Sequence, residues 1–193
     1  MERKVIDDCV VFFDRDVTFE ELRKLFSPGF DGDIVINGSL IDDGSVLLTD
    51  MPITEVSIYG NLWILGNYKP NTWRNINRLI INGSLYSKSN INIDGDLEVC
   101  GDLVLYENIC SGNIFVGENF NAYGYINAGD IFVVRNFVTQ KEIDSCQVVV
   151  TQNWSCYNRA NTCQVIVGQK FECYGGINTN GYSILVGQSE INY

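Results

Sequence analysis

A repeat of 17 residues runs without a gap from Asp96 to Asn180. The chain divides there into five lines: DLEVCGDLVLYENICSG, NIFVGENFNAYGYINAG, DIFVVRNFVTQKEIDSC, QVVVTQNWSCYNRANTC and QVIVGQKFECYGGINTN. Repetition at a fixed period of this length is typical of solenoids, in which each repeat buries its apolar side chains by stacking on its neighbours. The sequence therefore predicts one elongated domain.

The side chains that point inward are identified by aligning the five lines and numbering their positions from one to 17. Positions two and four are aliphatic in every line, which is the spacing of one face of a strand. Position eight holds a large apolar residue, position 14 an aliphatic one, and positions 10 and 16 mostly smaller residues. These positions form three inward pairs per coil. We therefore expect an all-β fold, a single parallel β-solenoid of roughly triangular cross-section.

The same register extends beyond the regular block. Segments 33–40, 55–62 and 78–85 match Asp96 to Leu103, and Ser183 to Val186 begins a last partial coil. Their uneven spacing indicates insertions near Pro52 and Pro70. We predict about nine coils over residues 31–193, which makes a rod about 40 Å long at the spacing of stacked strands. We expect right-handed winding because the coils lack a strict six-residue repeat.

Residues 1–30 do not follow the repeat and are predicted to form a strand-helix cap. Cys9 to Phe13 resembles a buried strand. Thr18 and Glu21 form a capping box, which satisfies the first free amides of a helix. The apolar residues of that helix are expected on one face: Phe19, Leu22, Leu25 and Phe26. A cap of this kind protects the terminal coil of a solenoid from edge-to-edge aggregation.

Two sets of residues are assigned to the corners between strands. Glycine takes positive φ at little cost, and on this ground we expect it at corners: Gly38, Gly60, Gly83, Gly95 and Gly101. Position 15 holds residues predicted to form turns and to bond from coil to coil through their side chains: Asn127, Asp144, Asn161 and Asn178.

The charge and composition of the chain argue against several classes of function. A formal net charge of −11 argues against nucleic-acid binding through phosphate contacts. The chain shows no cleavable leader and no apolar run of membrane-spanning length, so we expect a cytoplasmic protein that does not bind membranes.

The seven cysteines follow the coils and not a disulfide framework, with Cys156 stacked on Cys173 and Cys146 on Cys163. We interpret them as reduced packing or corner residues.

Catalysis is not expected. The chain contains no histidine, which removes the commonest general base and every Ser-His or Cys-His pair. Without histidine and without a CxxC pair we expect no metal site and no cofactor. Acidic residues near Asp94, Asp96, Glu98 and Asp102 could in principle form an acid and base pair. Acidic residues near the corners of a solenoid are usually only solvated, so we predict a protein that is not an enzyme.

Position three lies between two inward positions and should face outward. From the second line onward it is apolar, and Leu185 continues the row into the last coil. We call this row the apolar stripe: Phe115, Phe132, Val149, Ile166 and Leu185. Soluble monomers rarely leave such a continuous row exposed. Either the amino-terminal helix or an insertion covers it, or it is an interface for self-association or for a protein partner.

Position 11 is the other outward row. We call it the tyrosine row: Tyr106, Tyr123, Tyr157 and Tyr174, with Gln140 between the two pairs. Rings stacked on successive coils stabilise a solenoid through their mutual contacts. The row could also hold an extended glycan, although no matching set of polar residues accompanies it at this position.

The segments INGSL (36–40), INIDGDLEVCGDL (91–103) and NIFVGENF (113–120) resemble the bactofilins and related polymer-forming β-solenoids. The resemblance covers residues 33–193 as a pattern. It implies stacked short strands with glycine corners and assembly end to end into cytoskeletal filaments. Our first hypothesis is therefore a cytoplasmic scaffolding protein that acts through self-association or protein binding. The alternative is an acidic inhibitor of the immunity type, which binds a basic partner such as a nuclease toxin.

Overall fold

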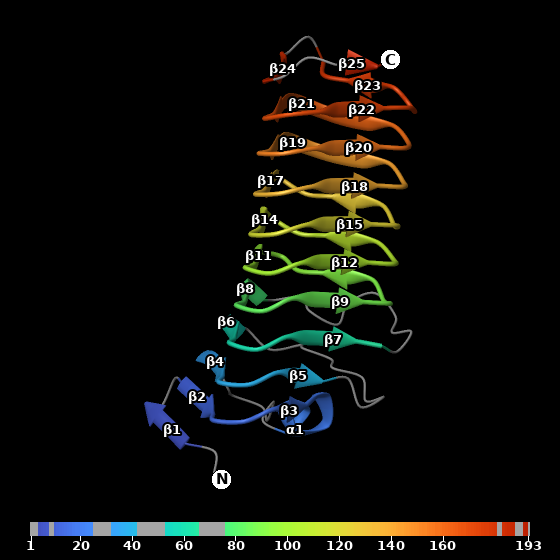
Figure 1. The fold of residues 1–193 in the computed structure, drawn as a ribbon. Helices are drawn as coiled ribbons and strands as arrows, with labels where there is room; N and C mark the ends of the chain where they lie inside the picture. The colour runs from blue at the N-terminus through green and yellow to red at the C-terminus, as the bar shows by residue number, and fades with distance from the viewer. Residues whose placement is uncertain are drawn as a thin grey trace.

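The chain forms a β-solenoid rod in a computed structural model, which describes residues 4–7, 10–24, 32–41, 53–65, 76–180, 183–187 and 191–192 (Figure 1). The predicted insertions near Pro52 and Pro70 lie outside these residues. Successive coils stack along the rod, and each coil carries short strands on up to three faces. The predicted parallel β-solenoid is confirmed.

Face one contains positions one to four of the repeat, and its strands pair in parallel from one end of the rod to the other. They are β2 (Val10–Phe13), β4 (Gly32–Ile36), β6 (Ile53–Ile58), β8 (Ile76–Ile81), β11 (Asp96–Val99), β14 (Ile114–Val116), β17 (Asp130–Val133) and β24 (Ile184–Val186). Between β17 and β24, the face is completed by the second halves of two long strands, β19 (Ile143–Val150) and β21 (Ala160–Val167).

Face two contains positions eight to ten. Its strands are β3 (Val17–Thr18), β5 (Leu40–Ile41), β7 (Leu62–Ile64), β9 (Leu85–Ser87), β12 (Leu103–Leu105), β15 (Phe120–Ala122), β18 (Phe137–Thr139), β20 (Trp154–Cys156), β22 (Phe171–Cys173) and β25 (Ile191–Asn192). Face three contains positions 14 and 15. It consists of β10 (Ile91–Asn92), β13 (Ile109–Cys110), β16 (Ile126–Asn127), the first halves of β19 and β21, and β23 (Ile177–Asn178).

The number of complete coils differs from the prediction. Strands occupy all three faces in about six turns, fewer than the predicted nine. In the part of the chain described here, the rounds that begin with β2, β4 and β6 carry strands on faces one and two only. Face three begins at β10, where the insertions have ended and the spacing settles toward 17 residues.

The interior is a continuous apolar core. Positions two, four and eight are buried in every regular coil, as predicted. At position eight the rings stack on one another, with centroids 4.7 Å apart for Phe120 and Phe137, 5.5 Å for Phe137 and Trp154, and 4.7 Å for Trp154 and Phe171. Because each ring contacts the rings above and below it, this stack links the coils as well as filling the rod.

The amino-terminal segment belongs partly to the solenoid. The predicted capping box is present: Glu21 N donates to Thr18 Oγ1 (3.3 Å), and Thr18 N donates to Glu21 Oε2 (3.0 Å). The helix α1 (Phe19–Arg23) buries Phe19 and Leu22. Leu25 and Phe26 lie outside the described residues.

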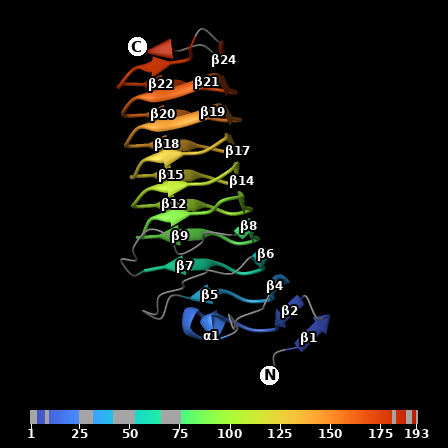
Figure 2. The ribbon, with the colours of Figure 1, turned by 180° about the vertical axis from the view of Figure 1, so that it is seen from behind.

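The strands of this segment continue the two main faces. β2 and β3 pair in parallel with β4 and β5, so the stacked sheets already begin inside residues 1–30. One further strand, β1 (Lys4–Asp7), pairs antiparallel with β2 at the end of face one. The helix α1 lies at the same end of the rod (Figure 2).

The glycines at the corners have a different role from the one predicted. Among the described glycines only Gly176 has a positive φ, at 90°. The others are needed because the coils approach closely: a Cβ on Gly60 would lie 2.6 Å from the carbonyl oxygen of Gly38, and one on Gly83 2.4 Å from that of Gly60. A side chain at these corners would push neighbouring coils apart.

The prediction that position 15 holds turn residues is wrong. Its residues lie on the strands of face three and not in turns. The predicted bonding between coils is present at one step, where Asn161 Nδ2 donates to Asp144 Oδ1 (2.8 Å).

A polar ladder that sequence reasoning missed runs along position seven, just before face two. In each step a side-chain oxygen accepts the backbone N–H of the residue one coil further on. Asp16, Ser39, Asn61, Ser84 and Asp102 form its first part. It continues from Asn119 to Asn136, and from Asn153 to Lys170. The ladder satisfies corner amides that no strand could pair.

We predict that Asn119→Ala destabilises the protein by about 1–3 kcal/mol, because it leaves the corner N–H of Asn136 without an acceptor. Urea unfolding followed by circular dichroism measures the change. Asn121 on β15 is a matched control, since its side chain bonds to no other described residue. An equal loss of stability in Asn121→Ala would show that the ladder has no special role.

Candidate functional site

The apolar stripe lies on the outside of face one, as predicted. Strand register places its residues on one another: Phe115 pairs with Phe132, Phe132 with Val149, Val149 with Ile166, and Ile166 with Leu185. The rings of Phe115 and Phe132 stack with centroids 5.1 Å apart and planes 3° apart. Five neighbouring coils therefore present one uninterrupted apolar row.

The stripe is accessible at both ends. Phe115 is 39% exposed and Leu185 54%, while the three residues between them are half-buried. The helix α1 packs against β3 at the amino-terminal end of the rod, several coils away (Figures 1 and 2). Of the two coverings considered from the sequence, the helix is therefore excluded, and the insertions lie outside the described residues.

A shallow hollow of about 180 Å³ lies beside the stripe. Its lining includes Phe115, Phe132, Gly117 and Val134. Gly117 has no side chain, whereas Val134 one coil further on is 53% exposed. The corner next to the two phenylalanines is therefore notched, and Glu98 also lines the hollow.

The other edge of the stripe is polar. Position one carries Asn113, Asp130, Gln147 and Gln164, and Gln147 Nε2 donates to Gln164 Oε1 (2.7 Å). An apolar centre with a polar rim is the ordinary anatomy of a protein interface.

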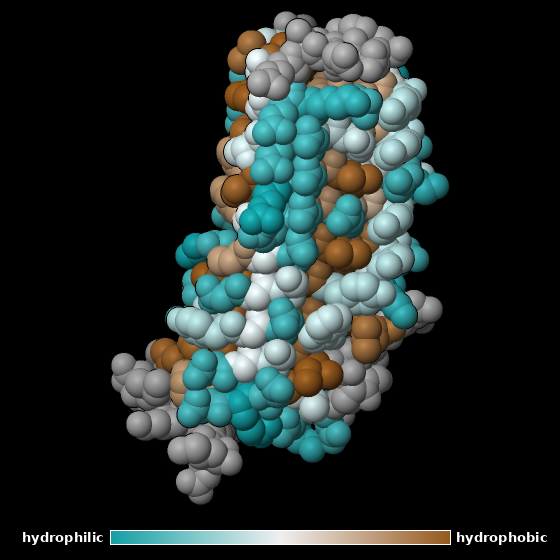
Figure 3. Space-filling view, viewed as in Figure 1, coloured by the Kyte–Doolittle hydropathy of each residue, from teal (hydrophilic) through white to brown (hydrophobic). Residues whose placement is uncertain are grey.

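The tyrosine row is confirmed as a set of ring contacts between coils. Tyr106 and Tyr123 stack with centroids 5.0 Å apart, and Tyr157 and Tyr174 with centroids 5.2 Å apart. Gln140 separates the pairs. Like-coloured side chains gather in rows along the rod in Figure 3, because each position of the repeat recurs on every coil.

Sequence alignment missed two members of this aromatic surface. Tyr86 lies 5.4 Å from Tyr106, and Trp63 lies 5.8 Å from Tyr86, measured between ring centroids. Both occupy position nine and not position 11, so a search along one column does not find them. Trp63 is the direct strand partner of Tyr86, and the ring of Tyr86 reaches that of Tyr106 across the two-residue offset.

The buried thiols Cys156 and Cys173 face each other on β20 and β22, and both are free. A hydrogen bond between the two thiols, together with burial, raises the pKa of Cys156 above its ordinary value. The same bond lowers the pKa of Cys173 to about 7. Both side chains pack in the core, which agrees with the predicted packing role.

No group of three potential metal-ligating side chains is found among the described residues.

The formal net charge of −11 follows from the excess of Asp and Glu over Lys and Arg, and most of the described basic side chains lie in ion pairs. Ion pairs join Arg15 to Glu21, Lys24 to Glu20, Arg78 to Glu55 and Glu98, Arg135 to Glu118, and Lys170 to Glu172. Asp102 and Asp130 have no basic partner among the described residues. No described helix has the length and apolar character needed to cross a membrane.

We predict that Tyr106 ionises above the ordinary pKa of tyrosine, because a hydrogen bond with the side chain of Tyr86 favours its neutral form. A raised pKa in the folded state means that this bond stabilises the protein below the unfolded pKa, and that the contribution is lost as the pH rises through the folded value. Difference absorbance of phenolate between the parent protein and Tyr106→Phe reports the midpoint. Tyr86→Phe should lower it, and an unchanged midpoint would exclude the bond.

Comparisons with known proteins give no family for this chain. A scan against protein-family models finds no match, and searches of curated proteins and of solved structures find no significant match. The resemblance to the bactofilins therefore stays a prediction from the sequence pattern.

Proposed function

We propose that this protein is a non-enzymatic, cytoplasmic scaffold whose rigid rod associates with a second copy of itself through the apolar stripe. The observation that carries the proposal is the alignment of Phe115, Phe132, Val149, Ile166 and Leu185 on the outside of five stacked coils. A row of this kind, about 20 Å long at the spacing of stacked strands, is unfavourable in water and becomes favourable when a matching surface covers it.

The order of side chains along the stripe supports a second copy as the partner. A two-fold axis through Val149 would bring Phe132 opposite Ile166 and Phe115 opposite Leu185. Large rings then meet smaller aliphatic residues at each step. Such self-complementarity is what an isologous interface requires. The exposed Leu185 would approach the notch beside Gly117, which lies next to Phe115.

The charge of the chain favours the other proposal drawn from the sequence, an acidic inhibitor of a basic partner such as a nuclease toxin. The formal charge of −11 supports it, because an acidic chain attracts a basic partner. Association driven by charge weakens with added salt, whereas association through the apolar stripe does not. Salt dependence therefore separates the two proposals.

We predict that Phe132→Glu abolishes self-association, because it places a charge at the centre of the apolar contact. Sedimentation equilibrium over a range of protein and salt concentrations measures the mass. Val138→Glu is the matched control, since Val138 is the middle, half-buried residue of β18 on the same coil but on face two. It should associate as the parent protein does.

Leu185→Glu tests the end of the stripe and should weaken association less than Phe132→Glu. Circular dichroism and thermal unfolding confirm that the variants keep the fold. A parent protein that is monomeric at all concentrations contradicts the proposal. So does association that survives Phe132→Glu.

A further inference from the structure

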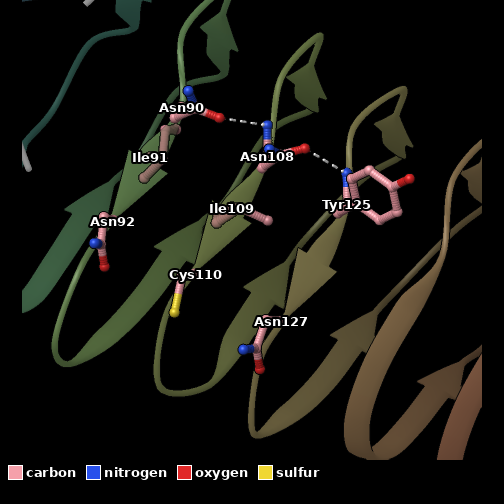
Figure 4. A pocket seen from close by; sticks show the side chains of 8 residues that line it. All are labelled: Asn90, Ile91, Asn92, Asn108, Ile109, Cys110, Tyr125 and Asn127. Atoms are coloured by element: carbon pink, nitrogen blue, oxygen red, sulfur yellow. Dashed lines mark hydrogen bonds between the residues drawn. The ribbon is translucent and has the colours of Figure 1, made fainter. Parts of the chain in front are cut away.

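A groove of about 420 Å³ lies on face three, away from the apolar stripe (Figure 4). It crosses three neighbouring coils at β10, β13 and β16. Its volume is in the range of sites that bind small molecules. The strands beneath it pair in register, Ile91 with Ile109 and Ile109 with Ile126, so its shape is held by the backbone of the rod.

One side of the groove consists of the side-chain amides of Asn90 and Asn108, followed by the ring of Tyr125. Asn108 N donates to Asn90 Oδ1 (3.1 Å), and Tyr125 N donates to Asn108 Oδ1 (2.9 Å). These bonds hold both asparagine side chains in place and use their oxygen atoms. Each amide nitrogen is left as a donor. The ring of Tyr125, 52% exposed, forms the end of this side (Figure 4).

The opposite side is a row of outward side chains at position 15. Figure 4 shows Asn92, Cys110 and Asn127 on successive coils. Neither Asn92 nor Asn127 has a side-chain hydrogen bond to any other described residue. Each can therefore both donate to a ligand and accept from it.

The lining carries no charge, although the chain as a whole has a net charge of −11. Anions would find no cation here, and metal ions or organic cations would find no carboxylate. A wholly apolar ligand would leave the amides without partners, which is costly. The groove suits a neutral ligand that is rich in hydroxyl groups and has an apolar face to lie against a tyrosine ring.

We propose that this groove binds a neutral saccharide one or two rings long. The amides of Asn92 and Asn127 bond to its hydroxyls, the amide nitrogens of Asn90 and Asn108 donate to its oxygens, and Tyr125 packs against the C–H face of one sugar ring. The groove is on a different face from the stripe, so the proposal holds whether or not the rods associate.

The test is titration of the full chain with a panel of neutral mono- and disaccharides built from glucose, galactose, mannose and N-acetylglucosamine, followed by amide-resolved NMR. We expect at least one sugar to bind saturably with a dissociation constant of about 1 mM. The signals that move should be the side-chain amides of Asn92, Asn108 and Asn127 and the backbone of Tyr125.

Tyr125→Ala should weaken this binding about tenfold, through loss of the ring contact. Tyr123→Ala is the matched control: Tyr123 is 45% exposed on the same coil, but belongs to the tyrosine row and not to the groove. It should bind as the parent protein does. If Tyr125→Ala does not fold, Asn127→Ala replaces it, because Asn127 is exposed and bonds to no described residue.

Three outcomes overturn the proposal. One is the absence of saturable binding by every sugar in the panel. Another is a set of shifted signals that lies along Tyr106, Tyr123 and Tyr157, which would move the glycan to the tyrosine row. The third is binding that Tyr125→Ala and Asn127→Ala both leave unchanged.

Discussion

Hydrogen bonding from each coil to the next is the interaction on which the rest of this structure depends. Parallel pairing supplies it on the three faces, and the ladder at position seven supplies it at a corner, where no strand continues. Asp102 accepts from both the backbone and the side-chain amide of Asn119. These bonds hold the register, and the stacked rings of Phe120, Phe137, Trp154 and Phe171 can form only when the register is held.

The same stacking makes the surface. The residue at an outward position of one coil lies next to the residue at the same position of the next coil. Similar residues at one repeat position therefore form a row along the rod. Phe115 next to Phe132 begins an apolar row, Tyr106 next to Tyr123 an aromatic one, and Asn92 next to Cys110 a neutral polar one that continues to Asn127. Our two proposals use different faces of the rod, so neither proposal depends on the other.

Much of the fold follows from residue types at fixed spacing. Alternating aliphatic residues such as Leu97 and Val99 predict a strand and its inward face, and Thr18 with Glu21 predicts the helix start. Other features depend on distances between coils, which cannot be obtained from the spacing of residues along the sequence. Gly60 is required by the carbonyl of Gly38 and not by its own φ. Tyr86 joins the aromatic surface because its ring reaches Tyr106 from a different repeat position, and the groove beside Tyr125 is formed by three coils together.

The sequence by itself determined the solenoid, its inward positions and the composition of the outward rows, because a repeat of 17 residues repeats the same burial on every coil. The tertiary structure decided how many turns are complete, which corner atoms bond, and that α1 lies away from the stripe. Those features depend on how closely neighbouring coils approach and on where α1 packs. Only the folded rod brings residues 17 or more positions apart to within a few ångströms.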